Sequence, residues 1–150
     1  MKSILILMLT LFFINVSGQD LSVSTGLEQT VAGTELQISG GYVTKKNWSL
    51  GAFHQSKITN ASSETDNSKQ GASWYGLYIN APIANTKKIN VFLQMRTGFY
   101  ENQFIVVVPS LETNINLNKM ISLGFGTSLR YSYPAFSFKS NIQLFNIHKK

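Results

Sequence analysis

Apolar and polar residues alternate along nearly all of the chain after residue 19, and this period of two constrains the fold more than any other feature. In the clearest stretch, 120–131 (MISLGFGTSLRY), large apolar residues and one threonine alternate with Ser, Gly and Arg. Because successive side chains of a strand point to opposite faces, such a segment predicts a strand with one apolar face. After residue 19 no segment has the period of an amphipathic helix, so the sequence predicts an all-β protein.

Counting these segments gives eight strands, expected at 20–28, 34–43, 48–58, 73–82, 88–99, 104–113, 120–131 and 135–145. Most exceed the ~5–6 residues of an ordinary strand, and they match the ~9–11 residues with which a tilted strand crosses a bilayer. A closed barrel leaves no strand edge unpaired in lipid, and membrane barrels of bacteria have an even strand number. The expected fold is therefore an eight-stranded antiparallel up-and-down transmembrane β-barrel.

Residues 1–18 have the three parts of a secretory signal peptide. Lys2 supplies a positive start, residues 4–14 form an apolar run broken only by Thr10, and small and polar residues follow. The run is too short for the ~20 residues of a membrane-spanning helix. We expect cleavage between Gly18 and Gln19, a barrel domain at 19–150, and export to the outer membrane of a Gram-negative cell.

The composition excludes several classes of function. The chain has no cysteine, which excludes a disulfide scaffold and a thiolate metal site, and its two histidines lie far apart in sequence. The formal net charge is +6, but the basic residues form no concentrated stripe of the kind that binds nucleic acid. We expect no cofactor, no metal and no nucleic-acid partner.

The connections between the expected strands differ in length on the two sides. The longest, 59–72, follows the third strand and is the candidate surface loop, with Asn60, Glu64, Asp66, Asn67 and Lys69 as its candidate contact residues. The opposite set, 44–47, 83–87 and 114–119, is short and rich in Asn and Lys. Short periplasmic turns and longer outer loops are typical of outer-membrane barrels.

In its N-terminal apolar segment, its eight alternating strands and its short turns, the chain resembles small bacterial outer-membrane β-barrels such as OmpX and the barrel domain of OmpA. The resemblance is architectural, covers 19–150 and includes no diagnostic motif. One departure is that Phe145 is followed by the polar end NIHKK, whereas such barrels often finish on an aromatic residue that aids insertion. The resemblance implies outer-membrane lipid and the barrel-assembly machinery as partners.

Three acidic and three basic residues fall on the polar phase of their strands and are expected to face the lumen: Glu28, Glu35, Glu112, Arg96, Arg130 and Lys139. An eight-stranded barrel is just wide enough for side chains to fill it, and buried charges are costly unless paired. The sequence therefore predicts a hydrogen-bonded plug, to which five amide residues also contribute: Gln37, Asn90, Gln94, Asn141 and Gln143. A gated pore is the alternative.

Aromatic residues near the strand ends are candidates for the two girdles that membrane barrels place at the lipid–water interfaces. They are Tyr42, Trp48, Tyr75, Phe99, Tyr131, Tyr133 and Phe136. The alternative is that these rings pack in the core of a water-soluble barrel.

His54 and Ser56 lie on one face of the third strand, where a histidine could activate a serine. An H-x-S pair at a lipid-facing rim resembles the PagL-type lipid A deacylases, which are also eight-stranded outer-membrane barrels. The pattern departs from that family because Lys57, and not Asn, follows the serine, and because the strand is the third. The nearest acidic residue that could orient the histidine is Glu64.

The sequence favours a non-enzymatic outer-membrane barrel with a plugged lumen, whose 59–72 loop serves interaction, adhesion or membrane integrity. One alternative is a soluble exported barrel resembling lipocalins, which would bind a small apolar ligand and place its large apolar residues inside. The apolar run 104–108 favours that alternative, whereas the charged fraction of 13% opposes it, because soluble surfaces carry about 25–35% charged residues. The second alternative is the lipid A deacylase.

Overall fold

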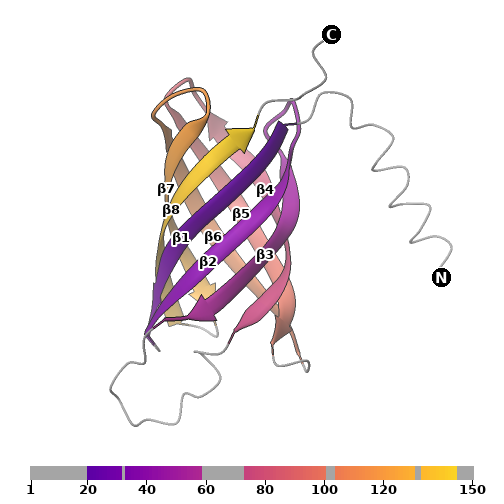
Figure 1. The fold of residues 1–150 in the computed structure, drawn as a ribbon, viewed down its shortest axis with the longest axis vertical. Helices are drawn as coiled ribbons and strands as arrows, with labels where there is room; N and C mark the ends of the chain where they lie inside the picture. Colours follow the sequence, from indigo (N-terminus) through magenta and orange to yellow (C-terminus); the bar gives the residue numbers. More distant parts are fainter. Residues whose placement is uncertain (1–19, 32, 59–72, 101–103, 131–132, 145–150) are drawn as a thin grey trace, which may run out of the picture.

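The structure, a computed structural model, describes residues 20–31, 33–58, 73–100, 104–130 and 133–144. They form an eight-stranded antiparallel closed barrel (Figure 1). The strands are β1 (Asp20–Thr30), β2 (Gly33–Val43), β3 (Ser49–Lys57), β4 (Trp74–Asn85), β5 (Ile89–Tyr100), β6 (Phe104–Asn116), β7 (Ile121–Arg130) and β8 (Tyr133–Leu144). Each strand pairs with its neighbours in sequence, and β1 pairs with β8 to close the barrel. The expected fold class is confirmed.

The barrel has two ends, which differ in their connections. At the turn end, short turns join β2 to β3, β4 to β5 and β6 to β7, and the first residue of β1 and the last of β8 lie at this end (Figure 1). The remaining connections are at the loop end. The expected signal peptide and the 59–72 loop fall outside the described residues. Within those residues no helix is long and apolar enough to cross a membrane.

Two strands continue further toward the turn end than the sequence predicts. β4 ends at Asn85, and β6 at Asn116, because Asn85 still pairs with Asn90 and the backbone N–H of Asn116 donates to the carbonyl of Lys88 at 2.8 Å. Pro82 lies within β4. The register shifts between Pro82 and Ala84, and this irregularity accommodates a residue that lacks an N–H.

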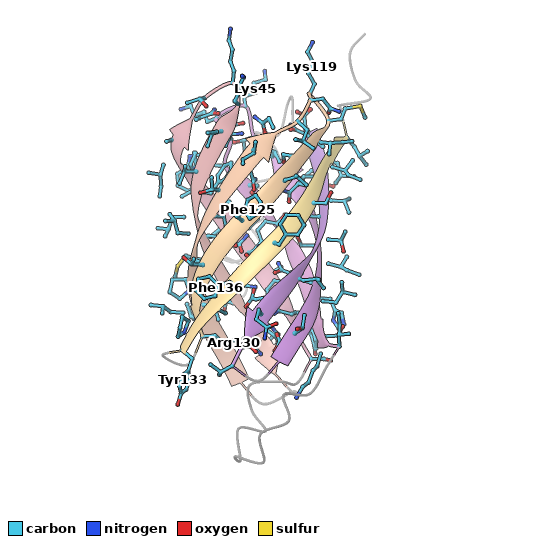
Figure 2. The ribbon with its side chains drawn as sticks, turned by 90° about the vertical axis from the view of Figure 1, so that its left-hand side faces the viewer. Lys45, Lys119, Phe125, Arg130, Tyr133 and Phe136 are labelled. Atoms are coloured by element: carbon cyan, nitrogen blue, oxygen red, sulfur yellow. The ribbon has the colours of Figure 1, made fainter. Side chains whose placement is uncertain are left out.

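Large apolar side chains point outward from every strand, and polar side chains point into the lumen (Figure 2). Leu77 on β4 and Phe136 on β8 are 58% and 62% exposed, whereas Arg96 and Glu28 are fully buried. The soluble alternative requires the reverse arrangement, with large apolar residues inside. A continuous apolar exterior of this extent marks a surface that contacts lipid or another apolar phase.

Six of the seven aromatic residues expected in the girdles are exposed on the outside, and Tyr131 lies outside the described residues. Tyr42 and Trp48 lie toward the turn end. Tyr75 and Phe99 lie toward the loop end on neighbouring strands, with ring centroids 6.2 Å apart, and Tyr133 begins β8 at the same end. The exterior therefore carries aromatic side chains toward both ends, while aliphatic side chains and the Phe125–Phe138 pair lie between them.

Candidate functional site

The six charged residues expected in the lumen are buried there and form three ion pairs. The pairs are Arg96 Nη1 with Glu28 Oε2 at 2.7 Å, Arg130 Nη1 with Glu35 Oε2 at 2.6 Å, and Lys139 Nζ with Glu112 Oε1 at 2.8 Å. The two partners of each pair come from strands that do not pair with each other. Each ion pair therefore links separate parts of the barrel wall through the lumen, and the three positive charges balance the three negative ones.

Trp74 occupies the loop-end half of the lumen and is fully buried between two arginines. The guanidinium carbons of Arg96 and Arg130 lie 5.5 and 5.0 Å from its ring centroid, within the ~6 Å range of a cation–π contact. The indole Nε1 donates to Gln55 Oε1 at 2.9 Å, and Phe53 packs edge-on with centroids 4.5 Å apart. The sequence pattern did not identify this aromatic centre of the plug. The pattern does place Trp74 on the polar phase of its strand, whose side chains point inward.

Gln55 joins the two arginine pairs into one network. Its Oε1 also accepts from Arg96 Nη1 at 3.1 Å, and its Nε2 donates to Glu35 Oε2 at 2.5 Å. Within the described residues, Glu35 Oε1, Arg96 Nε and Nη2, and Arg130 Nε are buried without a hydrogen bond. The plug therefore depends on its ion pairs and on the contacts of both guanidinium groups with Trp74.

The turn-end half of the lumen is hollow. A cavity of about 620 Å³ extends to the turns and is lined mainly by hydroxyl and amide side chains: Ser22, Ser24, Ser39, Ser49, Asn80, Asn90, Gln94, Asn114, Asn116, Ser122, Asn141 and Gln143. Of the five amides expected in the plug, Gln37 accepts a hydrogen bond from Arg96 Nη1 at 3.1 Å. The prediction is wrong for Asn90, Gln94, Asn141 and Gln143, because they line this cavity. Many of these side chains are short serines, and they leave space in this half of the lumen, whereas longer side chains fill the loop-end half.

Tyr78 forms part of the cavity wall and needs two glycines to do so. A Cβ at Gly41 would lie 2.6 Å from the Tyr78 hydroxyl, and a Cβ at Gly51 would lie 2.7 Å from its ring. Gly41 and Gly51 face each other on β2 and β3. The pair makes room for an inward tyrosine between the plug and the hollow half.

His54 and Ser56 lie on the outside of the barrel. His54 is exposed and stands opposite Ile38 and Tyr75, and Ser56 is half-buried. Within the described residues no hydrogen bond joins His54 to Ser56. Glu64 and the other candidate loop residues, Asn60, Asp66, Asn67 and Lys69, fall outside the described residues. Among the residues that the structure describes, no group of three His, Asp or Glu could hold a metal ion.

A closed eight-stranded barrel with an apolar exterior and a charged lumen has the architecture of a transmembrane β-barrel. Solved structures with the same fold include two de novo designed transmembrane β-barrels, each 8% identical with a TM-score of 0.67. They cover 83% and 87% of this chain and 95% and 98% of their own. Another is the outer-membrane protein Ail of Yersinia pestis, 6% identical, with a TM-score of 0.55 over 83% of this chain and 99% of that chain.

At such low identity these likenesses show the fold alone. The architecture implied by the resemblance to small outer-membrane barrels is confirmed. No family model matches the sequence, and no curated protein matches it.

Proposed function

We propose that the chain is an outer-membrane protein that spans the bilayer as a barrel, conducts no solutes and acts without catalysis through the surface at its loop end. The plug carries this proposal. Trp74 and the Arg96–Glu28 and Arg130–Glu35 pairs close the loop-end half of the lumen. A protein with a blocked lumen and an apolar exterior has its two ends left for interaction with soluble or surface components.

The two ends of the barrel differ in charge and in the length of their connections, and this difference supports one orientation across the outer membrane. Exposed lysines gather at the turn end: Lys45, Lys46, Lys87, Lys88 and Lys119 (two are labelled in Figure 2). The longest connection, 59–72, belongs to the loop end. Because outer-membrane barrels have short periplasmic turns and longer outer loops, the proposal places the turn end in the periplasm. Loop 59–72 then faces the surroundings and contacts a surface partner, serving adhesion or membrane integrity.

Replacing residues 60–70 by a Gly/Ser segment of equal length tests the membrane assignment and the role of the loop. Both forms should sediment with outer membranes and migrate differently on gels before and after boiling, because the strands that close the barrel are unchanged. The altered form should lower the adhesion of expressing cells, or their exclusion of an apolar dye, several-fold. Recovery of the unaltered chain in the soluble fraction contradicts the membrane assignment. Unchanged adhesion and dye exclusion contradict the role of the loop.

A further inference from the structure

The cavity in the turn-end half of the lumen is a blind pocket. Trp74 and the ion pairs around it close the loop-end side, and Lys87, Lys88 and Lys119 stand among the lining residues at the turns. Its volume of about 620 Å³ lies within the range of about 300–1,000 Å³ that is common for small-molecule sites. The pocket is therefore large enough for a ligand that enters from the turn end.

The wall of the pocket offers neutral hydrogen-bonding groups. Serine hydroxyls and Asn and Gln amides each both donate and accept hydrogen bonds. The charged groups of the wall, Glu112 and Lys139, are paired with each other at 2.8 Å. Tyr78 and Phe92, together with several aliphatic residues and a methionine near the turns, add apolar surface on which the faces of sugar rings can pack: Val43, Leu117, Met120, Ile121 and Ile142. This lining matches a ligand with many groups that also donate and accept, which is the chemistry of a carbohydrate.

Two hydrogen bonds of the wall, both donated by Asn141, are long compared with the shortest ion pair of the plug. Asn141 Nδ2 donates to Asn114 Oδ1 at 3.3 Å and to Ser122 Oγ at 3.4 Å, whereas Arg130 donates to Glu35 at 2.6 Å. A Cβ at Gly124 would lie only 2.6 Å from Asn114 Oδ1, so the glycine leaves room for this amide beside the cavity. Weakly engaged amides exchange partners with a ligand at low cost.

We propose that this pocket binds a carbohydrate of disaccharide size from the turn end, and that the lysines at its mouth favour an acidic one. The inference rests on the proposed orientation, which exposes the turn end to the periplasm. Lys87, Lys88 and Lys119 are exposed and attract an anionic group in a salt-dependent manner. The neutral wall then holds the sugar rings.

Titration of the full mature chain in lipid nanodiscs tests the proposal, with NMR detection of the side-chain amides. The neutral probe is N,N′-diacetylchitobiose, and the acidic probe is N-acetylglucosaminyl-N-acetylmuramic acid. We expect saturable shifts at Asn114 and Asn141, with several-fold tighter binding of the acidic probe that disappears at high salt. The variant N114A/N141A should bind about tenfold more weakly or worse. The control variant T127A, changed on the exposed outer face of β7, should bind like the unaltered chain.

Absence of saturable shifts at the pocket amides with both probes overturns the inference, as does undiminished binding by N114A/N141A. If that variant does not fold, the residue-resolved titration of the unaltered chain decides alone. The same nanodisc sample shows by its heat-dependent gel mobility whether the barrel is inserted. A correctly inserted barrel that binds neither probe therefore overturns this inference and leaves the proposed function standing.

Discussion

The variant Glu28→Gln should lose about 3–5 kcal/mol of the free energy of unfolding, because it leaves a buried arginine without its charge partner. Arg96 and Glu28 are both fully buried and lie 2.7 Å apart. The remaining hydrogen bonds of Arg96 Nη1 go to the neutral side chains of Gln37 and Gln55, each at 3.1 Å. The measurement is urea unfolding in lipid vesicles, followed by the heat-dependent shift in gel mobility.

The double variant Glu28→Gln/Arg96→Met removes both charges and should recover much of this loss, since replacing both partners of a buried pair is often close to neutral. Lys45→Gln is the matched single-charge control at an exposed turn, and its effect should stay within about 0.5 kcal/mol. A double variant as unstable as Glu28→Gln alone would show that the ion pair is not what stabilises this part of the plug.

Introducing an arginine on the outer face should have the second large effect. Phe125 lies on β7, is 48% exposed and packs against Phe138 with ring centroids 5.1 Å apart (Figure 2). On the lipid face of a membrane barrel, an arginine near the midplane costs about 2–4 kcal/mol, falling to about 0–1 near the interfaces. Phe125→Arg should therefore be clearly less stable than Phe125→Ala, which removes only the aromatic contact. Urea titration in vesicles measures both variants.

The matched control for this prediction is Leu117→Arg, at the turn between β6 and β7. Leu117 is 60% exposed, more than Phe125, but it lies outside the strands. If the barrel is in a bilayer, the arginine should be tolerated at this turn and costly at position 125. Equal, small effects at both positions would indicate that water surrounds the whole exterior.

The period of two predicts correctly which side chains enter the lumen, because alternation depends only on the local geometry of a strand. It does not predict which charges meet. Three acids and three bases allow several sets of pairs, and the choice depends on the stagger of the closed barrel. The pairing of Arg96 on β5 with Glu28 on β1, 68 positions apart in sequence, is a product of that stagger.

The sequence likewise does not predict that the lumen is divided into a plug at the loop end and a cavity at the turn end. The alternation alone predicts one filled network of charged and amide residues and assigns no role to Trp74. The structure places Trp74, Gln55 and both arginine pairs toward the loop end, and Asn141 and Gln143 toward the turn end. A position along the barrel axis follows from strand register, which a single sequence does not determine.

The two tryptophans provide the most direct test of the central claim, a barrel with its apolar face in lipid and its polar face inside. Trp48 is 45% exposed on the exterior, and Trp74 is fully buried in the lumen. The measurement is the fluorescence of the variants Trp74→Phe and Trp48→Phe in vesicles of brominated lipid. We expect strong quenching of Trp48 in the first variant and several-fold weaker quenching of Trp74 in the second. Equal quenching of both residues, or quenching of neither, would contradict the account.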